Sequence, residues 1–172
     1  MDDVRQYSME SLFVSPSQGK LALEEVIREI ILFISEENRQ GYRLIIGTDS
    51  QVNYGVDFVN AIVVHRVGRG GRYFWRRLRR EYKKPLALKA RMFTEANLSI
   101  QLAGEVLLLL QHELASAFVE LSPHIEVHID IGQNGPTKEM IKELVGMVKG
   151  SGFEAHIKPE AYAASCVADK YT

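Results

Sequence analysis

The sequence predicts an α/β protein whose core is one mixed five-stranded sheet, a three-stranded antiparallel meander plus two parallel strands, flanked by helices. Two patterns predict this fold. Three strand-like segments follow one another with glycine-containing turns between them, and the chain then alternates helical and strand periodicities. A length of 172 residues, with 46% hydrophobic and 25% charged residues, suits a single globular domain over residues 1–172.

An additional helix precedes the sheet. Residues 1–17 show weak periodicity and end in Ser-Pro-Ser, so we expect an arm or loop there. Apolar residues then recur at helical spacing, which predicts an amphipathic helix from about Lys20 to Asn38 packed on the sheet. We therefore divide the domain into an arm with an added helix (residues 1–40) and a core (residues 43–172).

The meander is predicted from three consecutive segments with strand character. They are Arg43–Asn53, Asp57–Val67 and Arg72–Tyr82, and the segments Asn53–Gly55 and Gly68–Gly71 supply the turns. Turns this short join antiparallel neighbours, so the three strands should pair in chain order.

The second half of the chain alternates helices and strands. A long helix is expected first, because Leu98, Leu102, Val106 and Leu109 form an apolar stripe at helical spacing. The elements expected in this half are a helix at Phe93–Phe118, a strand at Ile125–Ile131, a helix at Pro136–Lys149, a strand at Phe153–Lys158 and a short helix at Ala161–Tyr171.

Several classes of protein do not fit the sequence. We find no apolar run of the roughly 18 to 20 residues that spans a bilayer and no basic-then-apolar leader, so we expect a cytoplasmic protein without membrane contact. The single cysteine, Cys166, cannot form an internal disulfide and is expected to be a small core residue. His65 and His128 fall in strands without a second histidine at metal spacing, which favours interior positions over metal ligation.

Positive charge is concentrated in one segment. The net charge is −1, yet the segment from Arg66 to Arg91 holds eleven basic residues and one acidic residue, with aromatic residues between them. Such a segment can grip phosphates and stack on bases, although charge can also protect an exposed edge strand from aggregation. The candidate nucleic-acid contacts are Arg72, Trp75, Arg76, Arg77, Arg79, Arg80, Lys83, Lys84 and Arg91.

Two aspartates end apolar strands. Asp49 follows Leu44–Thr48, and Asp130 follows Ile125–Ile129. If the two strands are parallel neighbours, both carboxylates reach the same rim of the sheet, where they would repel each other. A divalent cation would resolve that conflict, because Mg²⁺ takes carboxylate oxygens as ligands.

Two further acids join this set by helical spacing. Glu95 heads the apolar stripe of the long helix and faces inward, whereas Glu105 faces outward. Asp169 lies in the last helix, where small neighbours allow a carboxylate to approach a strand end. Each acid alone has an ordinary alternative, as a cap, a first-turn helix charge or a solvated terminal residue. Together, Asp49, Glu95, Asp130 and Asp169 form a candidate metal site for Mg²⁺ or Mn²⁺.

Polar residues next to the strand acids are additional candidates for substrate contact. These are Ser50, Gln51, Asn53, Gln133 and Asn134, although turns use the same residue types. Lys138, in the first turn of its helix, fits either a phosphate site or an ordinary solvated lysine.

The order of elements and acids resembles the ribonuclease H-like fold. The motifs are IIGTDSQ on the first strand, FTEANLS in the long helix, VHIDIGQNGPTK after the fourth strand and YAASCVADKYT in the last helix. Over about Arg43–Thr172, the chain resembles an uncharacterised bacterial family of ribonuclease H-like proteins. The resemblance implies that the four acids bind two Mg²⁺ or Mn²⁺ ions that drive phosphodiester hydrolysis.

The sequence also departs from relatives of that fold. Proofreading exonucleases carry Asp-x-Glu on the first strand where this chain has Asp49-Ser50-Gln51, and the loop before the last helix lacks the histidine that assists some ribonucleases H.

We expect a metal-dependent nuclease, acting by a two-metal mechanism on RNA, DNA or a hybrid. The alternatives are a non-catalytic module that binds nucleic acid or a partner, and a phosphohydrolase for small nucleotides.

Overall fold

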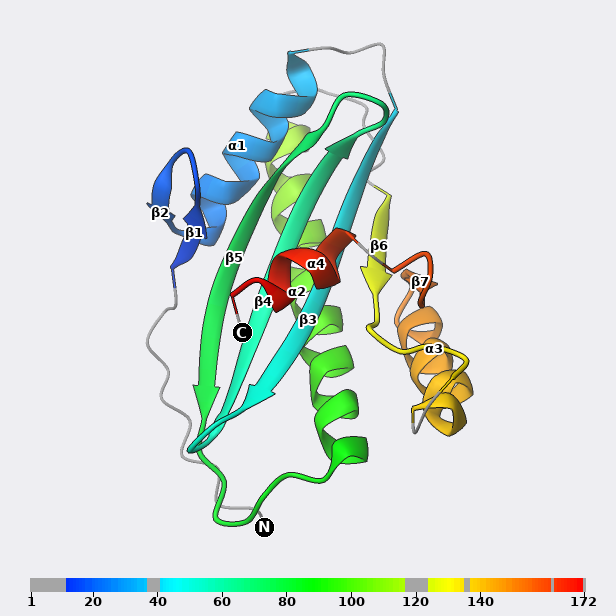
Figure 1. The fold of residues 1–172 in the computed structure, drawn as a ribbon. Coiled ribbons are helices and arrows are strands. Elements are labelled where there is room, and N and C mark those ends of the chain that lie inside the picture. The colour runs from blue at the N-terminus through cyan, green and yellow to red at the C-terminus, as the bar shows by residue number, and fades with distance from the viewer. Residues whose placement is uncertain (1–11, 37–40, 117–123, 135–136, 162, 172) are drawn as a thin grey trace.

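The computed structural model describes residues 12–36, 41–116, 124–134, 137–161 and 163–171. Figure 1 shows one long twisted sheet with helices α1, α2 and α3 behind it and helix α4 across its front face. In chain order the elements are β1 (Phe13–Ser15), β2 (Gly19–Leu21), α1 (Leu23–Ser35), β3 (Tyr42–Val52), β4 (Val56–Arg66), β5 (Gly71–Arg80), α2 (Leu88–Ser116), β6 (Ile125–His128), the 3₁₀ helix η1 (Lys138–Met140), α3 (Ile141–Gly150), β7 (Glu154–His156) and α4 (Ala163–Asp169).

The predicted mixed sheet is confirmed. Strands β3, β4 and β5 pair as an antiparallel meander, and β6 and β7 extend the sheet in parallel from β3. The turn between β4 and β5 depends on Gly68 and Gly70, whose φ angles of +79° and +83° suit glycine. The sheet has seven strands in the order β2-β1-β5-β4-β3-β6-β7, two more than predicted.

The two additional strands come from the segment expected to be an arm or loop. β1 and β2 pair as an antiparallel hairpin, and Val14 of β1 pairs with Trp75 of β5. Strands of three residues are too short to show the alternation by which a strand is predicted. Residues 1–11 of the predicted arm lie outside the described part of the chain.

Alternation along β3 assigns its side chains to two different cores. Leu44 and Ile46 pack into the large core formed with α1, α2 and α3. Ile45 packs in a smaller cluster with Ala168 of α4. Because neighbouring side chains in a strand point to opposite faces, Asp49 lies on the α4 face and Ser50 on the α2 face.

Several predicted boundaries differ from the structure. Helix α1 begins at Leu23 because Gly19–Leu21 forms a strand, and α2 begins at Leu88, five residues before the predicted start. β6 ends at His128, so Asp130 lies just beyond the strand. The predicted helix positions Asn38, Phe118 and Pro136 lie outside the described residues.

Helix α2 contains a long apolar stretch. Among the described helices, only this one, over Leu88–Ala115, is long enough and holds an 18-residue stretch apolar enough (mean hydropathy 1.2) to cross a membrane. A core helix passes the same test, and α2 packs Leu102, Val106 and Leu110 against the sheet. The core therefore accounts for part of its apolar character, while Leu108 of the same stretch is 69% exposed.

The structure corrects the prediction for the single cysteine. Cys166 is exposed, not a core residue. Helix α4 packs on the sheet through Val167 and Ala168. Cys166, which precedes them in the helix, therefore lies on the solvent side.

Candidate functional site

Asp49 lies on β3, half-buried, on the face of the sheet that α4 covers. Burial raises the pKa of Asp49, and the carboxylates of Asp130 and Asp169 raise it further. The backbone N–H of Ser50 and the charge of Arg91 act in the opposite direction. Three carboxylates from β3, the end of β6 and α4 therefore lie close enough to repel one another.

Glu95 approaches the same place from α2. It is only 2% exposed, and its Oε1 accepts a hydrogen bond of 2.5 Å from the hydroxyl of Ser50. Burial raises the pKa of Glu95 to about 8, with a further contribution from the negative charge of Asp49. The expected inward orientation of Glu95 is confirmed, and Glu105, ten residues later, is exposed as predicted.

Asp130 has a cationic partner that the sequence did not reveal. The ammonium nitrogen of Lys158 lies 2.5 Å from Oδ1 of Asp130. The hydrogen bond with Asp130 raises the pKa of Lys158, and the charges of Asp49 and Asp169 add to the effect. One ammonium group therefore contacts Asp130 and lies within the electrostatic influence of two more of the four predicted carboxylates.

Asp169 is the last residue of α4 and is exposed. Its charge acts on both Asp49 and Lys158, which places it with the other acids. Each of the four carboxylates that the sequence singled out thus interacts electrostatically with at least one other member of the set.

An aromatic contact holds α4 over the sheet. The ring of Tyr171 stacks on Trp75 of β5 with 4.2 Å between centroids and an interplanar angle of 10°. The hydroxyls of Tyr171 and Tyr73 are 3.0 Å apart, and Arg77 donates a hydrogen bond to the carbonyl oxygen of Tyr171. Trp75 was predicted to stack on a base, but its partner in the structure is within the chain.

A cleft of about 570 Å³ opens beside Asp130. Its walls come from the segment after β6 and the segment after β7, which carry Asp130 and Lys158. The residues that line it are Asp130, Gly132, Gln133, Asn134, Thr137, Lys158 and Pro159. Two of the predicted substrate contacts, Gln133 and Asn134, therefore lie in a cleft that begins at the carboxylate cluster.

The remaining polar candidates take other positions. Ser50 donates its hydroxyl to Glu95, so it positions a carboxylate. Gln51 is exposed at the end of β3, and Asn53 lies 3.5 Å from a carboxylate oxygen of Asp57. Lys138 is exposed in η1 and does not line the cleft.

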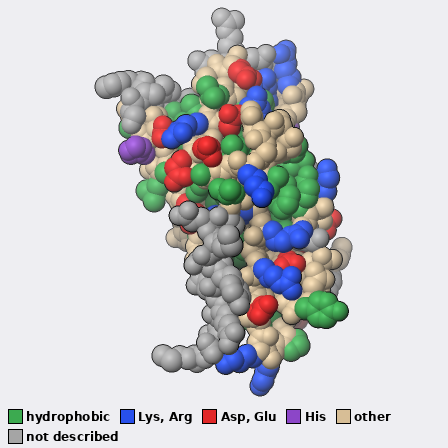
Figure 2. Space-filling model, turned by 90° about the vertical axis from the view of Figure 1, so that its left-hand side faces the viewer, with side chains coloured by type: hydrophobic (Ala, Val, Ile, Leu, Met, Phe, Trp, Pro, Cys, Tyr) green, Lys and Arg blue, Asp and Glu red, His purple; other side chains and the backbone are tan. Residues whose placement is uncertain are grey.

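Much of the basic segment is used inside the protein. Arg72 makes ion pairs with Glu29 of α1 at 3.0 Å and with Glu36, the residue after α1, at 3.5 Å. Arg76 donates to Asn60 on β4. Figure 2, which faces the side with α1, β1 and β5, shows the Lys and Arg side chains separated by acidic and apolar ones. The cations of the segment Arg66–Arg91 therefore do not form a continuous basic surface on this side.

The other cations of the segment lie nearer the acids or in solvent. Arg91, one helical turn before Glu95, acts electrostatically on Asp49 and Glu95. Arg80 is half-buried with its guanidinium 5.7 Å from the ring centre of Phe58. The exposed members of the predicted set are Arg77, Arg79, Lys83 and Lys84.

The strand register relates the exposed arginines to the acids. Asp49 pairs with Val59 of β4, and Val59 pairs with Arg77 of β5. Directly paired residues point to the same face, so Arg77 lies on the Asp49 face, two strands or about 10 Å away. Arg79 occupies the same face one step further along β5.

The fold and the carboxylate cluster define the class of protein. A meander followed by parallel strands, with acids on β3, on α2, after β6 and on α4, is the arrangement expected of a ribonuclease H-like protein. The family model described as "Ribonuclease H-like" matches residues 25–172, which includes most of α1 as well as the predicted core. The chain belongs to this ribonuclease H-like family.

One curated relative matches over nearly the whole chain. It is the uncharacterized protein YkuK of Bacillus subtilis (strain 168), 32% identical over 170 residues, which covers 94% of this chain and 96% of the relative. No solved structure matches the chain. The similarity therefore supports an uncharacterised bacterial family and its fold, and function must be argued from the site.

Proposed function

We propose that this protein is a divalent-metal-dependent nuclease that hydrolyses phosphodiester bonds in RNA or DNA. The observation that carries the proposal is the cluster of Asp49, Glu95, Asp130 and Asp169, with the ammonium of Lys158 among three of them. Carboxylates that repel one another are costly to maintain in a fold unless a cation neutralises them.

The residues present fit a hard divalent cation. All four donors are carboxylates, which Mg²⁺ and Mn²⁺ prefer, and the pKa values of Asp49 and Glu95 are raised by neighbours of like charge as well as by burial. A single lysine already neutralises part of this charge. Asp49, Glu95, Asp130 and Asp169 would hold the ions, which when bound supply an activated water and stabilise the leaving oxygen.

The residues around the acids have separate tasks. The Ser50 hydroxyl fixes one oxygen of Glu95, so this carboxylate cannot rotate freely. Lys158 lies at the junction of the carboxylates and the cleft, where its ammonium can bind a phosphate oxygen of the substrate. Gln133 and Asn134 line the cleft and can donate hydrogen bonds to sugar or phosphate.

The substrate backbone is expected to cross the sheet away from the acids. Arg77 and Arg79 are exposed on the Asp49 face of β5, and Lys83 and Lys84 follow in the next segment. Arginine and lysine contacts to phosphates position a nucleic acid without reading its sequence. Figure 1 shows the lower part of β3, β4 and β5 extending beyond α4, with no described helix in front of it.

The competing proposal is a binding module that keeps the fold and does not hydrolyse. It would use the same cations, but it gains nothing from four carboxylates beside the phosphates of its ligand. The carboxylate cluster therefore favours the nuclease.

The decisive experiment compares the purified protein with Asp49→Asn and Glu95→Gln on labelled single-stranded RNA, single-stranded DNA, an RNA–DNA hybrid and duplex DNA. Glu105→Gln is the matched control, since it changes an exposed carboxylate on the same helix as Glu95. We expect cleavage with Mg²⁺ or Mn²⁺ by the unaltered protein and the control, and none by the two variants or with chelator. Binding that survives chelation, with no product from any substrate, would establish the binding module instead.

A further inference from the structure

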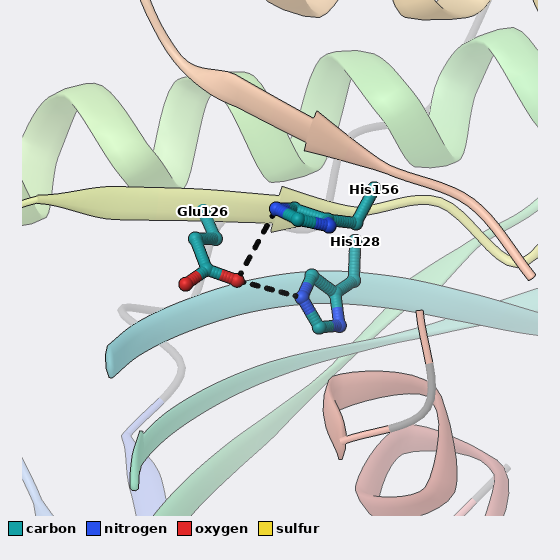
Figure 3. A group of neighbouring side chains, drawn as sticks. All are labelled: Glu126, His128 and His156. Atoms are coloured by element: carbon teal, nitrogen blue, oxygen red, sulfur yellow. Dashed lines mark hydrogen bonds and ion pairs between the residues drawn. The ribbon is translucent and has the colours of Figure 1, made fainter. Parts of the chain in front are cut away.

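A second group of side chains of the types that bind metals lies on β6 and β7. Glu126 and His128 belong to β6, and His156 belongs to β7, directly paired with His128. Figure 3 shows a ring nitrogen of each histidine pointing toward one carboxylate oxygen of Glu126. These three side chains contribute nothing to the acid cluster, whose donors are all aspartate and glutamate.

The distances within the group match those of a transition-metal site. Oε2 of Glu126 is 3.2 Å from Nε2 of His128 and 3.5 Å from Nε2 of His156. Metal–ligand bonds of about 2.0–2.2 Å in a tetrahedral site separate neighbouring donor atoms by about 3.4 Å. The three donor atoms all lie within 4.8 Å of one another, so only a small shift of these side chains is needed for all three to contact one ion.

The carboxylate of the group is held in place and ionised. Arg43 of β3 donates to both oxygens of Glu126, at 2.7 and 2.5 Å. Burial opposes ionisation, but these hydrogen bonds and one with His128 outweigh it and lower the pKa of Glu126 to about 2. A partner that orients a ligand in this way is typical of metal centres.

The group is reached from the β7 side. Glu126 and His128 are 5% and 2% exposed, whereas the side chain of His156 is 22% exposed. Nε2 of His156 also lies 2.7 Å from Oε1 of Glu154, whose other oxygen is 2.5 Å from Nε2 of His124. Glu154 is thus the nearest additional oxygen donor for an ion held by the three residues.

We propose that Glu126, His128 and His156 form a binding site for Zn²⁺ or a similar imidazole-preferring transition-metal ion, separate from the Mg²⁺-type carboxylate cluster. Imidazole nitrogens suit Zn²⁺, Co²⁺ and Ni²⁺, while carboxylates and water suit Mg²⁺ and Mn²⁺. The two sites would therefore select different ions in one protein.

An ion at this site would have a structural role, because of where the site lies in the fold. Asp130 follows His128 by two residues, and Lys158 follows His156 by two residues. An ion that joins β6 to the three-residue edge strand β7 would fix the spacing of the two segments that form the cleft. This role depends on the fold and not on the proposed nuclease activity.

The test uses Co²⁺ and Zn²⁺ alone with the full chain. Co²⁺ bound by two histidines and a carboxylate in a four-coordinate site absorbs strongly in the visible, whereas Co²⁺ among carboxylates and water absorbs weakly. We expect one equivalent of strongly absorbing Co²⁺, displaced by Zn²⁺ and unaffected by excess Mg²⁺. Binding of Zn²⁺, followed calorimetrically, should weaken by at least about 100-fold in His156→Gln.

Two variants separate this site from the carboxylate cluster. His112→Gln changes an exposed histidine on α2, outside the group, and should bind Zn²⁺ as the unaltered protein does. The double variant Asp49→Asn/Asp130→Asn removes acid-cluster donors and should retain the Co²⁺ spectrum. A strong Co²⁺ spectrum that persists in His156→Gln, or one that disappears in the double aspartate variant, would overturn the proposal. So would the absence of any strongly absorbing Co²⁺ in the unaltered protein.

Discussion

The ammonium nitrogen of Lys158 lies 2.5 Å from a carboxylate oxygen of Asp130, and the charges of Asp49 and Asp169 act on the same lysine. Lys158 thus occupies the place where a metal cation would neutralise these acids. A divalent ion and Lys158 should therefore compete for the same negative charge.

Replacing Lys158 by glutamine should tighten metal binding. The side chain is 56% exposed, so its repulsion of an ion is largely screened and should amount to about 1 kcal/mol, or roughly fivefold in affinity. Mn²⁺ binding followed by electron paramagnetic resonance measures the change. Lys149→Gln on α3 is the exposed control and should bind Mn²⁺ as the unaltered protein does. Weaker Mn²⁺ binding in Lys158→Gln would show that the lysine supports the site instead of competing for it.

Metal-free protein should lose stability as the pH rises. Burial raises the pKa of Glu95 to about 8, so the native state keeps this proton up to that pH, whereas the unfolded chain loses it near the ordinary glutamate pKa of 4.5. Between these values the native state binds more protons, so the free energy of unfolding falls with increasing pH, by up to about 5 kcal/mol in total. Burial and nearby carboxylates raise the pKa of Asp49 as well. The ionisation of Asp49 therefore also lowers the free energy of unfolding as the pH rises.

Urea unfolding between pH 5 and pH 8.5, in the presence of a metal chelator, measures how steeply the free energy of unfolding falls with pH. Glu95→Gln cannot ionise and should flatten this slope, while Glu24→Gln, an exposed position on α1, should leave it unchanged. Saturating Mg²⁺ should also reduce the slope, because a bound cation favours the ionised carboxylates. A slope that is identical in Glu95→Gln would remove Glu95 as its source.

Arg79 should contribute to nucleic-acid binding and Arg72 should not. Arg79 is exposed on the Asp49 face, whereas Arg72 is paired with Glu29 and Glu36. Each lost phosphate contact reduces the slope of log K against log salt by about 0.7 to 0.9. Fluorescence anisotropy at several salt concentrations should show this change for Arg79→Gln alone. An equal change in Arg72→Gln would mean that the ion pairs with α1 open when nucleic acid binds.

The stack of Tyr171 on Trp75 should hold α4, and with it Asp169, in place over the sheet. Trp75→Leu removes the stack with Tyr171, a contact that contributes about 1 kcal/mol beyond the area it buries. We expect faster amide hydrogen exchange in α4 and weaker Mn²⁺ binding. Tyr54→Leu, at a fully exposed ring, is the control. Unchanged exchange in α4 would show that Val167 and Ala168 hold the helix without the stack.

Helical phase and strand order were enough to predict the carboxylate cluster. Glu95 was placed inward and Glu105 outward because ten residues of helix separate two different faces. Asp49 and Asp130 were placed together because β3 and β6 are parallel neighbours, which the structure confirms. The helical prediction rests on a periodicity within one element, and the pairing of the two aspartates rests on the strand order of the predicted sheet.

The features that the sequence did not predict all depend on contacts between elements. Lys158 could not be assigned to Asp130, because nothing local links a residue after β7 to one after β6. His128 was interpreted as an interior residue, and its partner His156 becomes visible only through the β6–β7 register. The same reason explains why Trp75 and Arg72 were expected to contact nucleic acid, although both have partners within the chain.

Glu126, His128 and Asp130 recur at every second residue, so one face of a short stretch supplies donors to both sites. An insertion or deletion of a single residue between Glu126 and Asp130 would turn at least one of these side chains to the opposite face. Substitutions in the intervening apolar positions change only the volume of the core. Over evolutionary time this stretch should therefore accept changes of composition far more readily than changes of length, because a one-residue insertion or deletion disturbs at least one of the two proposed sites.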